Sequence, residues 1–206
     1  IILGLPANDR SNWAEFSSVR RDYFHSPAFN NLVEEWGYPR YPGDERNPDS
    51  SVLTVYAYPH ELDYPKVAQF GWFNLEVFNK NETKELVDLR QLLPGKFLSD
   101  DLGGNYSGKL IYVSMGSMGS IDVDLMRRLV RILALTPHKF IFSKGPLAEQ
   151  YDLNGTNQWG DRFLPQTALI PQVDLVITHG GNNSVTEIFA QGKPMIVMPL
   201  FADQYD

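Results

Sequence analysis

A histidine followed by two glycines lies at a turn near the end of this chain. His179, Gly180 and Gly181 follow the β-branched run 174–178, and an amphipathic segment begins a few residues later. Backbone amides at the start of a helix, beside residues that lack a Cβ, favour a bound anion such as phosphate. These residues therefore indicate a site for a phosphorylated ligand.

Two apolar runs around this turn predict a parallel strand–helix–strand unit. Residues 174–178 and 195–198 have the length and composition of short buried strands, and apolar residues between them fall at helical spacing. A crossover helix between two such strands makes them parallel, and Gly192 is placed to end that helix. In parallel sheets, ligands bind beyond the carboxyl ends of the strands, which is where the histidine and the glycines lie.

Ser184 and Glu187 also have a purely structural interpretation. Their spacing matches a capping box, in which the Ser184 hydroxyl binds the Glu187 amide and the carboxylate reaches back to the Ser184 amide. Because caps occur at most helix starts, either residue taken alone is more often a cap than a ligand. A lone histidine is likewise more often structural. The joint occurrence of these residues favours a ligand site.

A second unit of the same kind precedes the first. The apolar run KLIYVS, which starts at Lys109, ends in the loop GSMGS, and an amphipathic segment at 122–134 and a strand-like run at 139–143 follow. The loop lacks the glycine spacing of the dinucleotide fingerprint, and most such loops are ordinary turns between a strand and a helix. By itself the loop is therefore weak evidence for a site.

Four sequence blocks in this order resemble the donor-site signature of UDP-glycosyltransferases, the family 1 enzymes of GT-B fold. The blocks are FLPQ at 163–166, THGGNNSVTE at 178–187, GKP at 192–194 and PLFADQ at 199–204. Their spacing is more similar to bacterial macrolide-type and some invertebrate members than to vertebrate ones. The resemblance implies an α/β fold with a Rossmann-like parallel sheet. It also implies inverting transfer of a hexosyl group from a UDP-sugar to a hydroxyl of a small lipophilic or phenolic acceptor.

The resemblance implies a donor-side role for each matching residue. Phe163, where the family has tryptophan, would stack on uracil, Gln166 would lie at the base and ribose end, and Glu187 would accept hydrogen bonds from the ribose hydroxyls. Asp203 and Gln204 match the pair that holds the sugar hydroxyls. The positions that match the diphosphate site are Ser117, His179, Gly180, Gly181, Asn183 and Ser184.

The catalytic base of the family has no counterpart in this sequence. In the family it is a histidine early in the N-terminal domain, and neither His25 nor His60 has that context. We therefore expect an internal part of a longer protein, with a truncated donor domain. Residues 1–66 would be the end of the N-terminal acceptor domain, 67–108 the linker region between the domains, and 109–206 most of the C-terminal donor domain.

Two other interpretations stay open. Without its base, the chain would be a nucleotide-sugar binding module that performs no turnover. The chain could also come from another GT-B enzyme, such as a sugar-nucleotide epimerase or a cell-wall glucosaminyltransferase, but PLFADQ after HGGNNS argues against this. Glu187, Asp203 and Gln204 are all present, which favours an active parent enzyme.

Composition narrows the classes of partner. A net charge of -7 disfavours broad nucleic-acid binding, and no apolar run approaches the length of a membrane span. The resemblance implies a metal-independent reaction, and the absence of cysteine and the scatter of the histidines agree with the expectation of no metal site. The UDP-sugar would be a co-substrate and no cofactor is expected; Gln204 favours UDP-glucose. A cytoplasmic location is favoured if no signal peptide or anchor lies outside the segment.

Overall fold

The chain divides into two units, Ile1–Phe78 with Asp206 and Asn79–Tyr205. A computed structural model describes residues 27–39, 53, 55–62, 73–75, 88–98, 108–200 and 204. The domain boundaries predicted from the sequence stay predictions.

The first unit contains a small pair of parallel strands. Its elements are α2 (Pro27–Glu35), β1 (Val55–Tyr56), the 3-10 helix η1 (His60–Leu62) and β2 (Phe73–Asn74). β1 pairs with β2 in parallel. The Asn74 side chain extends this pairing, because its Oδ1 accepts the Tyr58 amide at 3.3 Å and its Nδ2 donates to the Tyr58 carbonyl at 3.1 Å.

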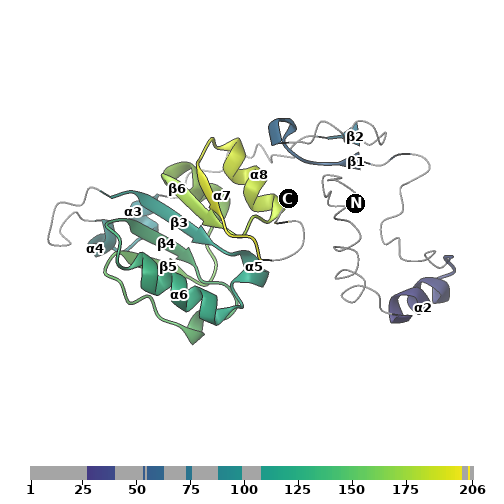
Figure 1. The fold of residues 1–206 in the computed structure, drawn as a ribbon, viewed down its shortest axis with the longest axis horizontal. Coiled ribbons are helices and arrows are strands. Elements are labelled where there is room, and N and C mark those ends of the chain that lie inside the picture. The colour runs from purple at the N-terminus through teal and green to yellow at the C-terminus, as the bar shows by residue number, and fades with distance from the viewer. Residues whose placement is uncertain are drawn as a thin grey trace. The chain divides into compact units, whose positions relative to one another are not determined.

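The second unit is built on a parallel sheet of five strands (Figure 1). The strands are β3 (Leu110–Ser114), β4 (Lys139–Ser143), β5 (Gln158–Asp161), β6 (Leu175–Thr178) and β7 (Met195–Val197). Their order across the sheet is β5-β4-β3-β6-β7, and every neighbouring pair is parallel. The predicted α/β class with a parallel sheet is therefore confirmed, and β5 is a strand that the sequence did not predict.

Helices cover both faces of this sheet. They are α3 (Leu89–Leu92), α4 (Gly95–Leu98), α5 (Gly116–Gly119), α6 (Val123–Leu133), α7 (Gln166–Leu169) and α8 (Asn182–Ala190), with 3-10 helices η3 (Ala148–Gln150) and η4 (Ile170–Gln172). α6 packs on one face, where Met126 and Val130 belong to the same core cluster as Val113 and Phe142. On the other face, α3, α4, α7, η4 and α8 pack against the alternate residues of the strands.

This double cover explains the sequence of the strands. In β3, the four residues from Ile111 to Ser114 are all buried, and in β4 the first four residues are buried. Successive side chains of a strand point to opposite faces, so a strand that is covered on both faces needs a continuous apolar run. Tyr112 accordingly belongs to one core layer and Val113 to the other.

Local signals in the sequence mark the start of α6 and the end of α8. Asp122 caps α6 by accepting the Leu125 amide at 2.9 Å. α8 ends before Gly192, which has φ +58°. The Gly192 amide donates to the Phe189 carbonyl at 2.8 Å, and the next amide donates to the Ile188 carbonyl at 3.2 Å. This pattern is a Schellman motif, which needs a left-handed residue and so favours glycine.

Candidate functional site

The middle of the sheet determines where a ligand can bind. β3 and β6 are neighbours there, and Ser114 at the end of β3 pairs with Thr178 at the end of β6. From β3 the chain continues outward to β4 and β5, whereas from β6 it continues to β7 on the other side (Figure 1). The loops after β3 and β6 thus leave the sheet towards opposite faces. Such a reversal of strand order opens a crevice at the carboxyl ends, where ligands of doubly wound sheets bind.

Glycines from both loops enclose the His179 ring. A Cβ on Gly116 would lie 2.5 Å from His179 Cε1, and a Cβ on Gly181 would lie 2.5 Å from His179 Nε2. Real Cβ atoms do not approach so closely, so a side chain at either position would displace the ring. Gly116 also has φ +66° and Gly180 has φ +86°, conformations that favour glycine. The two loops therefore fix the imidazole where they meet.

Thr178 provides a polar contact to the same ring. Its Oγ1 lies 3.4 Å from His179 Nδ1, and the Gly180 amide donates to this oxygen at 3.5 Å. Thr178 is fully buried at the end of β6. The hydroxyl therefore ties the orientation of the imidazole to the end of the strand.

The start of α8 differs from the predicted capping box. The helix begins at Asn182 with Gly181 as its N-cap, and no side chain of the described residues caps it. Ser184 is therefore inside the first turn, and the capping-box prediction for Ser184 and Glu187 is wrong. The physical reason is that the glycine pair lets the chain turn into the helix earlier. The first amides of a helix have no intrahelical acceptor, so the open start of α8 presents donors to a ligand.

Gln166 connects three elements beside this helix start. It is the first residue of α7, and its Nε2 donates to Glu187 Oε2 at 2.8 Å and to Ser184 Oγ at 3.3 Å. Its Oε1 accepts the Tyr112 hydroxyl at 3.5 Å. The structure thus brings the predicted residues Gln166, Ser184 and Glu187 into one polar cluster.

Tyr112 is a site residue that the sequence reasoning missed. It is 1% exposed in the middle of β3. Burial raises the pKa of its hydroxyl and the Glu187 carboxylate raises it further, whereas hydrogen bonds from Ser114 and Ser143 act in the opposite direction. The hydroxyl therefore stays protonated at neutral pH and can donate. The one available signal was a hydroxyl within an otherwise apolar strand.

The other predicted residues lie around this cluster. Phe163 is 65% exposed, with the Arg162 guanidinium carbon 5.9 Å from its ring centroid. Ser117 is exposed on α5, and Asn183 is exposed on the first turn of α8. Gln204 is buried, and its Oε1 accepts the Leu200 amide at 2.9 Å. Asp203 lies outside the described residues.

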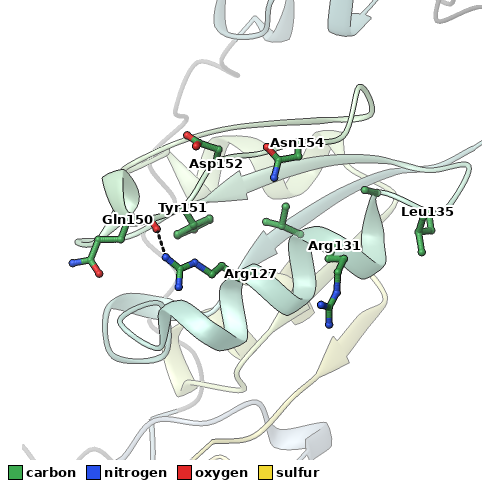
Figure 2. Close-up of a pocket in the computed structure, with 9 residues that line it drawn as sticks. Arg127, Arg131, Leu135, Gln150, Tyr151, Asp152 and Asn154 are labelled. Carbon is green, nitrogen blue, oxygen red and sulfur yellow. Dashed lines mark hydrogen bonds between the residues drawn. The ribbon is translucent and has the colours of Figure 1, made fainter.

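A separate groove of about 610 Å³ lies beside α6 (Figure 2). Its lining comes from the second half of α6 and from the segment 150–154, and Arg127 Nη2 donates to the Gln150 carbonyl at 2.9 Å. No predicted site residue is among the described residues that line it. The return from β4 to β5, which the structure describes throughout, contains only the 3-10 helix η3 and no α-helix.

The residues that the structure describes contain no group of three or more histidine, cysteine, aspartate or glutamate side chains that could hold a metal ion. In the same part of the chain, every helix is too short or too polar to cross a membrane.

Comparison with known proteins places the site in a family context. Residues 102–206 match the family described as "UDP-glucoronosyl and UDP-glucosyl transferase". Human UDP-glucuronosyltransferase 2B17 is 32% identical over 100 residues, which cover 47% of this chain and 18% of that protein. The uncharacterized UDP-glucosyltransferase YdhE of Bacillus subtilis (strain 168) is 33% identical over 101 residues, which cover 47% of this chain and 25% of that protein. The matches thus span a quarter or less of these relatives.

Two solved glycosyltransferase structures have a similar fold. The glycotransferase of kitacinnamycin has a TM-score of 0.64 at 20% identity and covers 97% of this chain and 50% of that one. The calicheamicin glycosyltransferase CalG4 has a TM-score of 0.56 at 18% identity, with 98% and 50% covered. At these identities the likeness shows the fold alone. The predicted GT-B fold with its Rossmann-like sheet is confirmed.

Proposed function

The chain belongs to the family of UDP-glucuronosyl and UDP-glucosyl transferases, and from this premise we propose that it binds the donor of a UDP-dependent hexosyl transfer. The acceptor is a hydroxyl of a small lipophilic or phenolic molecule, and the transfer inverts the anomeric centre. The observation that supports the proposal most strongly is that two groups of predicted residues lie next to the start of α8. These are the enclosed His179 and the cluster of Gln166, Ser184 and Glu187.

The uridine occupies the side of the site formed by α7 and α8. The exposed face of Phe163 stacks on uracil, since an aromatic ring of this exposure offers an open apolar surface. Glu187 accepts hydrogen bonds from the ribose hydroxyls, because a carboxylate is an acceptor that suits paired donors. Gln166 lies between base and ribose, held 2.8 Å from the Glu187 carboxylate.

The diphosphate occupies the start of α8. Open helix amides and the positive end of the helix dipole attract its negative charge. Gly180 and Gly181 let the backbone approach the phosphates closely, and His179 adds a ring nitrogen as a donor. Asn183 and the hydroxyl of Ser117 extend the donor set from the two loops. None of these groups requires a metal ion.

The sugar lies beyond the diphosphate, towards Gln204. A Cβ on Gly180 would lie 3.4 Å from the Gln204 backbone oxygen, so this residue is next to the glycine loop. Asp203, which precedes it, completes the pair that holds the sugar hydroxyls. The terminal amide of Gln204 favours glucose, which makes UDP-glucose the proposed donor.

The reaction itself is a displacement at the anomeric carbon. The acceptor oxygen forms a bond to that carbon while the bond to the diphosphate oxygen breaks, and a base takes the acceptor proton. Negative charge develops on the departing UDP, and preorganised amides at the α8 start stabilise it most in the transition state. The base is expected from a part of the protein outside this sequence, because the family places it early in the N-terminal domain.

Calorimetry of the chain with UDP and then UDP-glucose tests the proposal, together with a transfer assay on a small phenol. Binding of both ligands supports the donor site. Binding without transfer is the result expected if the base lies elsewhere, and the same result with a longer protein that contains the base would favour a binding module instead. A folded chain that binds neither ligand contradicts the proposal.

A further inference from the structure

We propose that Tyr112 is a positioning residue of the donor site: its hydroxyl anchors the Gln166 side-chain amide, which in turn holds the Glu187 carboxylate in place for the ribose. The inference rests on the proposed function of this site and adds a residue of the sheet core to it. Tyr112 lies under the site and needs no contact with the ligand.

The chemistry of the two ends of the amide supports this role. The Gln166 Oε1 can only accept hydrogen bonds, and Nε2 can only donate them. The Tyr112 hydroxyl lies 3.5 Å from Oε1, and the Glu187 Oε2 lies 2.8 Å from Nε2. A flipped amide would place two acceptor oxygens against each other at Glu187. The carboxylate therefore selects the orientation with Nε2 towards Glu187, and the Tyr112 hydroxyl, which can donate or accept, fits this orientation by donating to Oε1.

Tyr112 is itself held firmly. Its strand is the central one of the sheet, and its Cα pairs with Ile141 on one side and Val176 on the other. The ring is packed in the core layer that includes Leu169 of the α7 end and Ile188 of α8. The hydroxyl consequently has little freedom to move, and it ties the position of the amide to the sheet.

The hydroxyl keeps its proton in this environment. Burial raises the pKa of Tyr112, and the nearby Glu187 carboxylate raises it further. The side chains of Ser114 and Ser143, at the paired ends of β3 and β4, act against this shift. Hydrogen bonds thus join Tyr112 to Gln166 and Gln166 to Glu187.

The consequence concerns ribose recognition. Glu187 belongs to a helix at the rim of the site, and a hydrogen bond from Gln166 Nε2 is what fixes its carboxylate. If Gln166 loses its orientation, Glu187 also loses the partner that directs it towards the ribose hydroxyls. The affinity for a ligand without the 2′-hydroxyl should change less, because that ligand makes fewer of these bonds.

Calorimetry with UDP and 2′-deoxy-UDP measures this effect on the chain of 206 residues. Tyr112→Phe should reduce the preference for UDP over 2′-deoxy-UDP by about two- to tenfold, the range of one hydrogen bond. The ring and its packing remain, so the variant should fold, and a thermal melt checks this. Tyr151→Phe is the matched control, since Tyr151 is also buried and its hydroxyl donates to the Lys144 carbonyl at 3.1 Å in the other core layer. The preference of the Tyr151→Phe variant for UDP over 2′-deoxy-UDP should be unchanged.

A double variant separates positioning from general packing. In a Gln166→Ala background there is no amide to orient, so adding Tyr112→Phe should leave the preference unchanged. Equal loss of affinity for both ligands in Tyr112→Phe would indicate a merely structural role and overturn the inference. A preference that survives Tyr112→Phe, or that falls equally with and without Gln166, also overturns it.

The same data distinguish failure of the inference from failure of the proposed function. If the folded wild-type chain does not bind UDP, the proposed function is wrong and the inference falls with it. If it binds UDP without preferring it to 2′-deoxy-UDP, the ribose role of Glu187 is wrong and the inference is overturned. If the preference exists and Tyr112→Phe does not alter it, the inference alone is wrong.

Discussion

The two crossover units of the sheet begin alike and end differently. The unit β3–α6–β4 and the unit β6–α8–β7 start from neighbouring strands, and each has a glycine of positive φ within two residues of its strand end. In the first unit, α5 then intervenes and the Asp122 carboxylate caps α6. In the second, α8 starts at once after Gly181, without a side-chain cap from the described residues.

In the proposed donor site, this difference gives the two loops different roles. The glycines of the first loop leave room for neighbouring side chains. A Cβ on Gly116 would meet the His179 ring, and a Cβ on Gly119 would lie 2.7 Å from Leu200 Cδ1. The second loop supplies donors, because the start of its helix is open. A helix whose first amides are capped contributes stability, whereas an open one leaves its amides to a ligand.

The largest expected effect comes from adding a side chain at Gly116, next to the His179 ring. Gly116→Ala adds a strained left-handed residue and a clash with His179, so we expect a loss of about 2–5 kcal/mol of unfolding free energy and weaker UDP binding. Gly192→Ala is the control for strain alone, since its φ is +58° and an added Cβ would meet no described atom within 4 Å. It should lose about 1–3 kcal/mol and keep its UDP affinity. Equal losses in both variants would contradict the enclosure of the ring.

The second prediction concerns Glu187 of α8, the helix without a side-chain cap from the described residues. Glu187→Ala should weaken UDP binding by about tenfold or more, because bonds from ribose hydroxyls to a carboxylate are lost. The stability cost of a lost cap is not expected, because Glu187 takes no part in capping α8. Calorimetry beside a thermal melt checks both parts. Unchanged UDP affinity in a folded variant would sink the ribose role.

The third prediction concerns α6, the helix that has a side-chain cap. Asp122→Ala removes the cap of α6, whose carboxylate accepts the Leu125 amide at 2.9 Å. We expect a loss of about 1 kcal/mol in unfolding free energy and no change in UDP affinity. Chemical denaturation measures the first and calorimetry the second. A drop in UDP affinity with stability intact would remove the contrast between the capped and the open helix.

The smallest effect lies at the other end of the same two strands. Asp174 precedes β6 and accepts the Leu110 amide of β3 at 2.8 Å. This backbone bond, with Lys109 as a lesser cause, lowers the pKa of Asp174 below its ordinary value of 3.8. The stabilisation is therefore complete above this value and is lost as the pH falls through the lower folded pKa.

Asp174→Asn tests this connection. Because the Asp174 side chain is 45% exposed, we expect it to contribute less than about 1 kcal/mol. The stabilities of wild type and variant should converge as the pH falls below 3.8. UDP affinity at neutral pH should not change, since this residue lies at the amino end of the strand. A stability difference that grows with acid would contradict the assigned sign.

Much of the second unit could be predicted from the sequence. The helix at 122–134 and the strands at 139–143, 174–178 and 195–198 are all present within a residue or two of the predicted bounds. Their signals are local, because apolar periodicity and a glycine stop act within one element. β5 was missed since QWGD has no apolar run; it is an edge strand that forms by pairing with β4.

The sequence by itself determined which residue types stand at each turn, and in which order. Only the tertiary structure decided that the Gly116 loop encloses His179, and that Tyr112 supports Gln166 and through it Glu187. The physical reason is that a pattern along the chain reports on its neighbours a few residues away. Contacts between loops depend instead on β3 lying beside β6, and packing on both faces of the sheet sets that order.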